Sequence, residues 1–144
     1  MSEDSTIFEQ IAAGEIPARI VHETETILAF LDANPLAPGH TLIIPKEAYT
    51  KIGDLPDDVA AELWASAQSL TPTIETAVSA DATTVGINNG SAAGQEVPHV
   101  HIHIIPRFDD DGGGPIHAVA GTRPELSDSE LDDIAANIES ADNI

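Results

Sequence analysis

The chain has 144 residues, the size of one domain with a real core, and its 25 Asp and Glu against 5 Lys and Arg give a formal net charge of −20. Such a charge disfavours binding to DNA, RNA or an anionic membrane surface. The sequence contains no cysteine, which excludes disulfides and thiolate metal sites, and it has neither a run of about 20 apolar residues nor a leader pattern, so we expect a cytoplasmic protein.

The first half of the chain predicts one short helix followed by three strands. Residues 6–9, Thr-Ile-Phe-Glu, fit a capping box for a helix over residues 7–13, which Gly14 ends. Aliphatic or β-branched runs bounded by turn residues predict strands at 18–22, 26–31 and 40–44. The first two strands are separated by three polar residues, so we expect them to form a hairpin.

The second half predicts a long helix, two strands and a final helix. An apolar spacing of three to four residues indicates an amphipathic helix from Pro56 to about Ser79, and Pro72 is expected to kink it or divide it in two. The remaining expected elements are strands at 83–87 and 99–105, a Gly-rich connection at 88–98, a loop at 109–115, and a helix that a capping box at 127–130 begins and that ends near Ile138.

These elements predict an α+β fold: a mostly antiparallel five-stranded sheet with one long kinked helix and short terminal helices. We expect residues 1–108 to form the main domain. Residues 109–144 are expected to add an acidic loop and helix that belong to the same domain or pack on it.

The acidic residues are spread along the whole chain and do not form a tail. At low salt such a surface repels itself, whereas concentrated salt screens the repulsion. We interpret the composition as adaptation to a salty cytoplasm, which is typical of a halophile.

Half of the six histidines stand in residues 99–105, His-Val-His-Ile-His-Ile-Ile. In a strand, His99, His101 and His103 share one face and the aliphatic residues between them share the other. The aliphatic face belongs to a core, so the imidazole row lines something else. Neighbouring imidazoles lie about 6.7 Å apart along a strand, so two can reach one small group but three cannot.

Three interpretations of this row are open from the residues alone. The imidazoles are inert and hydrogen-bonded, or His99 and His101 hold a zinc ion with a carboxylate, or one neutral imidazole attacks phosphorus while its neighbours donate to the oxygens. The preceding residues 88–95 offer amides, a hydroxyl and flexible backbone N–H groups suited to an anion, which favours phosphoryl chemistry. Among the few cations, Arg107 lies nearest in sequence.

The pattern of alternating histidine and apolar residues at 99–105 resembles the signature of the histidine triad (HIT) family, and further likeness, closest to its Hint-type branch, covers most of the chain up to about Phe108. The resemblance implies a HIT-like fold and a homodimeric, nucleotide-binding hydrolase or transferase that requires no cofactor. It implies cleavage at the α-phosphorus of a purine nucleoside phosphoramidate or a dinucleoside polyphosphate.

The resemblance also implies a role for each histidine. His101 would attack phosphorus and form a nucleotidyl-histidine that water hydrolyses, and His103 would donate to the phosphate oxygens. His99 would sit near the leaving group, and His40 would support the triad from a neighbouring strand. Neutral imidazole suits this chemistry because it is both a good nucleophile and a good leaving group at phosphorus.

The rest of the implied pocket binds the nucleoside and the phosphate. Asp32 matches the carboxylate that binds the ribose hydroxyls, and Asn88 matches a polar contact near the phosphate. The implied purine slot comprises Ile7, Phe8, Ile11 and Phe30, and the implied phosphate loop comprises Gly94, Gln95 and Glu96. Glu96 departs from the family pattern, because many members carry a donating Ser or Thr there and an ionised carboxylate cannot donate.

Zinc-containing members carry two cysteines and a histidine where this chain has Thr6, Glu9 and Ala48, so we expect that structural zinc to be absent and the capping box to fix the first helix. Two alternatives to the metal-free enzyme are a nucleotide-sensing module with little turnover and a zinc hydrolase.

Overall fold

A computed structural model of the chain describes residues 5–142, which fall into two compact units: the first ends at Gly113 and the second begins at Gly114. The first unit contains α1 (Ile7–Ala12), β1 (Ile20–Glu23), β2 (Ile27–Leu31), β3 (Thr41–Pro45), η1 (Ile52–Asp54), α2 (Asp57–Val78), β4 (Ala82–Gly86), η2 (Ser91–Ala93) and β5 (Ile102–Arg107). The second unit contains η3 (Ile116–Ala118) and α3 (Asp128–Ala141).

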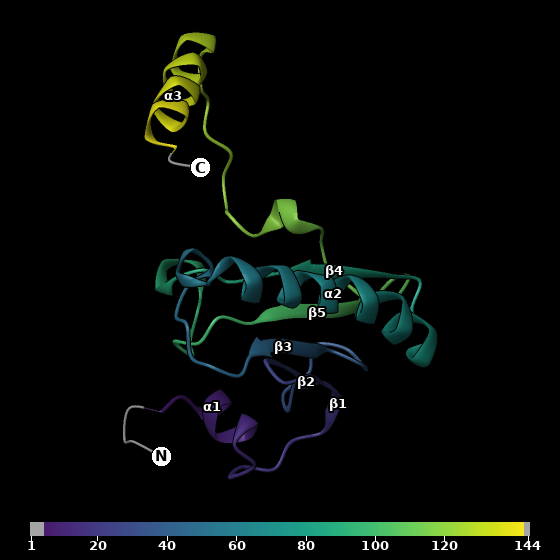
Figure 1. Cartoon of the computed structure of the whole chain (residues 1–144). Helices are drawn as coiled ribbons and strands as arrows, with labels where there is room; N and C mark the ends of the chain where they lie inside the picture. The colour runs from purple at the N-terminus through teal and green to yellow at the C-terminus, as the bar shows by residue number, and fades with distance from the viewer. Residues whose placement is uncertain (1–4, 143–144) are drawn as a thin grey trace. The chain divides into compact units, whose positions relative to one another are not determined.

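The five strands form one sheet in the order β1-β2-β3-β5-β4 (Figure 1). Every neighbouring pair is antiparallel, and β1 and β2 form the predicted hairpin. These observations confirm the predicted α+β class and its five-stranded antiparallel sheet.

Each face of the sheet carries its own apolar cluster. Along β2, Ile27 and Ala29 pack in the cluster that α2 contributes to, whereas Leu28 and Phe30 pack in the cluster that α1 contributes to. Successive side chains of a strand point to opposite faces. Because a helix covers each face, β2 and β3 are apolar at nearly every position, without the alternation of a strand that is exposed on one side.

The helix α2 runs unbroken from Asp57 to Val78, so Pro72 does not divide it. Its buried stripe includes Leu63, Ala67 and Leu70, as the apolar spacing predicted. Pro72 lies on the exposed side of the helix. Proline has no N–H to donate to the carbonyl one turn earlier, and on this side water can donate to that carbonyl instead. Packing of the apolar stripe against the sheet therefore outweighs the local preference of proline.

The strand β5 begins at Ile102, three residues later than predicted. Its pairing with β3 runs from Ile104 opposite Thr41 to Ile102 opposite Ile43. Before this point the backbone turns to another partner, because the N–H of Val100 donates to the carbonyl of Tyr49 at 2.7 Å. Val100 nevertheless stays buried in the same cluster as Ile102 and Ile104, so the alternation of the histidines with core residues survives outside the strand.

The two capping boxes predicted from the sequence are both present. At α1, Thr6 accepts from the N–H of Glu9, and at α3, Ser127 accepts from the N–H of Glu130. The helix α3 continues to Ala141, three residues past its expected end. Among residues 5–142 no helix is both long and apolar enough to span a membrane. The predicted relation of residues 109–144 to the main domain stays a prediction.

The charge imbalance predicts that stability depends on salt. Lys46 pairs with Glu23 at 2.7 Å and Arg107 with Asp111 at 2.8 Å, but 5 cationic side chains cannot neutralise 25 carboxylates. Raising KCl from 0.1 M to 1 M shortens the Debye length from about 10 Å to about 3 Å. We therefore expect the melting temperature, measured by calorimetry, to rise with KCl. Equal melting temperatures at the two salt concentrations would contradict this expectation.

Candidate active site

The four predicted histidines gather on the sheet face that α1 covers. His103 lies in β5 and His40 precedes β3, whereas His99 and His101 lie in the segment that leads into β5. The ring centroids of His101 and His103 are 4.9 Å apart, and those of His103 and His40 are 5.2 Å apart. Tertiary structure therefore packs the imidazoles more closely than a flat strand would.

Burial makes all four imidazoles less basic than in water. Loss of solvent lowers the pKa of His40, His99 and His101, and the pKa of His103 falls to about 4 because burial is reinforced by the nearby His101 and His40. Desolvation penalises the charged form of an imidazole. The rings are therefore neutral at pH 7, and each has one N–H and one lone pair.

The hydrogen bonds of His99 identify its tautomer. Its Nε2 lies 2.7 Å from the carbonyl oxygen of Pro45, which can only accept, so Nε2 carries the proton. Its Nδ1 then has the lone pair and accepts from the hydroxyl of Thr6, also at 2.7 Å. The side chain is fully buried, and both ring nitrogens have protein partners.

His101 has the opposite tautomer. Its Nδ1 lies 2.7 Å from the backbone carbonyl of His99 and therefore carries the proton. The lone pair is on Nε2, the nitrogen on the far side of the ring. A neutral imidazole held in this way presents a nucleophile of defined direction.

His40 and His103 form a relay that begins at the backbone. The N–H of Leu36 donates to Nδ1 of His40 at 3.1 Å, so the proton of His40 is on Nε2. That Nε2 lies 3.0 Å from Nδ1 of His103, which accepts. The proton of His103 is consequently on Nε2, and this buried nitrogen has no hydrogen-bond partner among residues 5–142. Buried donors in folded proteins nearly always have an acceptor, so this N–H is a candidate to bind an acceptor atom of a ligand.

Asp32 lies beside His40, the middle member of the relay. Its Oδ2 is 3.7 Å from Nε2 of His40, and its Oδ1 accepts from the N–H of Asn34 at 2.8 Å. One ligand atom each from Asp32, His40 and His103 lie within 4.8 Å of one another, a spacing that suits a metal ion. Both nitrogens of His40 are already used in the relay, so coordination there would break a hydrogen bond.

The predicted purine slot is partly assembled. Phe8, Ile11 and Phe30 belong to one buried cluster. The ring of Phe8 contacts the rings of Phe30, His99 and His101 edge-on, with distances between ring centroids of 5.6, 5.7 and 4.9 Å. Ile7 is 48% exposed and is not part of that cluster. An apolar wall therefore stands directly beside the nucleophilic imidazole.

The predicted phosphate loop is braced by one of its own members. The side-chain amide of Gln95 donates to the carbonyls of Thr50 and Val97, and its oxygen accepts from the N–H of Gly90. Gly94 has a φ of 94°, a left-handed conformation that favours glycine. Asn88 and Glu96 are exposed. The side chain of Gln95 thus holds the loop, and the roles of these four residues in nucleotide binding stay predictions.

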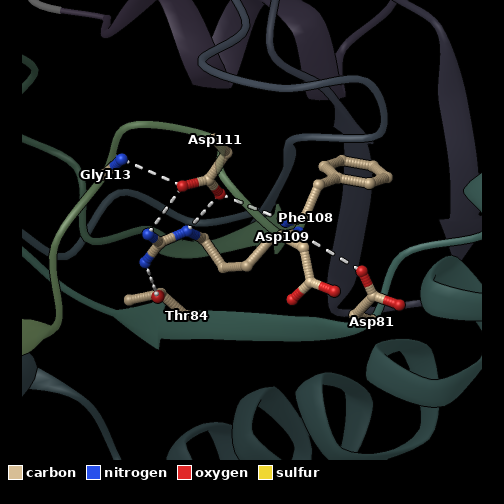
Figure 2. A network of polar contacts seen from close by, with 7 residues as sticks. Asp81, Thr84, Phe108, Asp109, Asp111 and Gly113 are labelled. Carbon is tan, nitrogen blue, oxygen red and sulfur yellow. Dashed lines mark hydrogen bonds and ion pairs between the residues drawn. The ribbon is translucent and has the colours of Figure 1, made fainter.

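Arg107, the cation nearest to the histidines in sequence, is engaged elsewhere. Figure 2 shows its guanidinium donating to both carboxylate oxygens of Asp111 and to the hydroxyl of Thr84. This bidentate pair, with the N–H groups of Gly113 and Phe108, holds the pKa of Asp111 well below its usual range. The guanidinium of Arg107 therefore already has protein partners outside the histidine cluster.

Sequence reasoning placed Thr6 in a helix cap but missed its bond to His99. It also missed the backbone groups of Leu36 and Pro45, which select two of the tautomers. The capping box was the one available signal for Thr6. Backbone partners leave no signal in side-chain identity, so pattern analysis had no means of finding them.

The lowered pKa of His103 predicts how stability changes with pH. Because the folded-state value of about 4 is below the ordinary 6.5, the unfolded chain binds this proton first, and stability is lost as pH falls from 6.5 towards 4. The slope for one such group is at most about 1.4 kcal/mol per pH unit.

Urea unfolding at 1 M KCl, which screens the carboxylates, measures this slope. His103→Asn should flatten it. A slope equal in the wild type and in His103→Asn would show that His103 titrates normally.

Comparison with known proteins adds to this geometry. A sequence profile of the HIT domain matches residues 13–110. The chain is 47% identical over 108 residues to an uncharacterized HIT-like protein, MJ0866, of Methanocaldococcus jannaschii, with 74% of this chain and 81% of that protein covered.

Two further proteins are similar. Adenosine 5'-monophosphoramidase HNT1 of Saccharomyces cerevisiae is 42% identical over 107 residues, which cover 74% of this chain and 65% of the yeast protein. A crystal structure of a HIT family member from Bacillus subtilis superposes with a TM-score of 0.87 at 32% identity, covering 98% of this chain and 99% of the other.

Proposed function

Because the chain belongs to the HIT domain family, we propose that it is a nucleotide hydrolase or transferase that cleaves at the α-phosphorus through a nucleotidyl-histidine intermediate. The observation that carries this proposal is that two ring nitrogens have complementary states. Nε2 of His101 has a lone pair, and Nε2 of His103 has an N–H with no partner among residues 5–142. A phosphoryl group needs both, a nucleophile at phosphorus and a donor to its oxygens.

In the first step, the lone pair of His101 Nε2 forms a bond to phosphorus, and the bond from phosphorus to the leaving group breaks. The leaving group departs with the electron pair and takes a proton from the solvent. The ring of His101 becomes positively charged, which the bond from its Nδ1–H to the carbonyl of His99 stabilises. In the second step, water attacks phosphorus and gives a proton to the solvent, and the bond from phosphorus to Nε2 breaks with its electron pair returning to Nε2.

His103 supplies the donor that meets the charge on the phosphate oxygens. Its N–H is aimed by the relay from Leu36 through His40, so the donor is in place before the substrate arrives. Prearranged donors of this kind contribute to catalysis because they need no reorganisation during the reaction. Asp32, 3.7 Å from His40, is the candidate acceptor for the ribose hydroxyls.

We propose two substrate classes, a purine nucleoside phosphoramidate and a dinucleoside polyphosphate. The similarity to a yeast phosphoramidase supports the first. The net charge of −20 also disfavours the more highly charged polyphosphate at low salt. The wall formed by Phe8, Ile11 and Phe30 supports an aromatic base in either substrate. We further propose that the protein is a cytoplasmic homodimer with one site in each subunit. Light scattering tests the dimer.

Replacement of the nucleophile is the first test. We expect His101→Ala to lower the rate of hydrolysis of an adenosine phosphoramidate by at least about 10³-fold, because no other group can form the covalent bond. Affinity for AMP, measured by calorimetry, should stay close to that of the wild type. A sample of the wild type that is quenched with substrate in alkaline denaturant, where a phosphorus–imidazole bond survives, should contain a nucleotidyl adduct, and His101→Ala should contain none.

His117→Ala is the matched control, since it removes a histidine that has no role in the proposed reaction, and it should retain turnover. The assay should be run at 1 M KCl with both substrates. A wild type that binds nucleotide but turns over neither substrate would support the alternative, a nucleotide-sensing module, and would refute the enzyme.

Treatment with a chelator is the second test. We propose that the reaction requires no metal, because the nucleophile and the donor are both imidazoles whose tautomers the protein selects. Dialysis against EDTA should leave the rate unchanged, and metal analysis should find no stoichiometric zinc. A loss of activity that zinc restores would favour the zinc hydrolase instead.

A further inference from the structure

The hydroxyl of Thr6 makes two hydrogen bonds of opposite sense. It accepts from the N–H of Glu9 at 3.0 Å, which caps α1, and it lies 2.7 Å from Nδ1 of His99. Because the carbonyl of Pro45 holds the proton of His99 on Nε2, Nδ1 has a lone pair and the hydroxyl of Thr6 donates to it. Thr6 therefore joins the start of α1 to a histidine 93 positions away in sequence.

The donation from Thr6 fits the tautomer of His99 that the carbonyl of Pro45 selects. With a donor at Nδ1, the proton of the neutral ring is on Nε2, where it bonds to the carbonyl of Pro45 at 2.7 Å. The other tautomer would set two lone pairs against each other at that carbonyl. Because His99 is fully buried, no water can compensate for a wrong choice.

The position of His99 determines the orientation of His101. The carbonyl of His99 accepts from Nδ1 of His101 at 2.7 Å, and the N–H of His99 donates to the carbonyl of Val97 at 2.8 Å. The side chain and backbone of His99 thus make four hydrogen bonds, and one of them is with the proposed nucleophile, His101. A shift of the His99 ring would turn the His101 lone pair away from its line of attack.

Thr6 also holds the helix that carries the apolar wall. The helix α1 has six residues, too short to be stable by itself, so it depends on its contacts with the sheet. Phe8, two residues after Thr6, touches the ring of His101 at a centroid distance of 4.9 Å. One hydroxyl therefore positions both a wall of the pocket and the support of the nucleophile.

We infer that Thr6 is a positioning residue for the reaction: by donating to Nδ1 of His99 it holds that ring in place and thereby sets the direction of the His101 nucleophile. The inference rests on the proposed function above. It also assigns His99 to the support of His101, in place of a position beside the leaving group.

Three variants separate donation from helix capping. Thr6→Ser keeps the hydroxyl and both bonds. Thr6→Asp keeps the cap, since aspartate is a strong N-cap acceptor, but its ionised carboxylate cannot donate to His99. Thr6→Val has the same shape and loses both bonds. Ser127→Ala removes the equivalent cap of α3, which has no histidine partner, and serves as the control.

The first readout is the protonation state of the two ring nitrogens of His99 in the ligand-free protein, measured by ¹⁵N NMR. The wild type and Thr6→Ser should show a proton on Nε2 only. In Thr6→Asp the carboxylate should attract a second proton to Nδ1, so that His99 titrates at a higher pH than in the wild type. This readout does not depend on turnover.

The second readout is the rate of nucleotidyl-adduct formation at 1 M KCl. We expect Thr6→Asp and Thr6→Val to react about 10- to 100-fold more slowly than the wild type, because a small misplacement of a reacting group costs rates of this order. Thr6→Ser and Ser127→Ala should react like the wild type.

The inference is overturned if Thr6→Asp reacts at the wild-type rate, or if Thr6→Ser loses as much activity as Thr6→Asp, which would indicate a packing role for the threonine methyl. Failure of the proposed function looks different. In that case the wild type itself forms no adduct with either substrate. The protonation of the His99 ring still differs by NMR between the wild type and Thr6→Asp.

Discussion

Hydrogen bonds between backbone groups and buried imidazoles determine what this site can do. A backbone N–H can only donate and a carbonyl can only accept, so each contact decides which nitrogen of a neutral ring carries the proton. Leu36 selects the tautomer of His40, Pro45 that of His99, and the carbonyl of His99 that of His101. The selection works because burial keeps the rings neutral, since a charged imidazole would donate from both nitrogens.

The same constraint resolves an apparent conflict between the protein and its proposed substrate. A chain with a net charge of −20 repels a nucleotide at long range, and its cation nearest to the triad in sequence, Arg107, is occupied by Asp111 and Thr84. The N–H of His103, which has no partner in the part of the chain that the structure describes, offers an oriented neutral donor at short range. Such donors act within hydrogen-bond distance and are little affected by salt, whereas the field of the surface carboxylates is screened by it.

The fold supports this arrangement by covering both faces of the sheet. The long helix α2 buries one face, where Val100, Ile102 and Ile104 anchor the histidine segment from behind. The short helix α1 covers the other face, where Phe8 lies against the imidazoles. The site is therefore built on a rigid sheet on one side and on a small helix, tied down by Thr6, on the other.

The sequence by itself determined most of the elements and singled out the histidines that the fold brings together. Local signals were sufficient for the capping boxes, the hairpin and the long helix, because capping and apolar periodicity act over a few residues. The alternation from His99 to Ile104 separated the imidazole face from the core face correctly. Where local preference met tertiary packing, as at Pro72 and at the start of β5, the sequence was a weaker guide.

Only the tertiary structure made the histidines chemically different from one another. In the sequence His99, His101 and His103 are equivalent members of one repeat, and nothing in their side chains distinguishes nucleophile, donor and support. Their differences come from partners far away in the chain or in the backbone, such as Thr6 and the carbonyl of Pro45. An imidazole has two alternative positions for one proton, and the choice between them is made by whichever groups the fold brings to its two nitrogens.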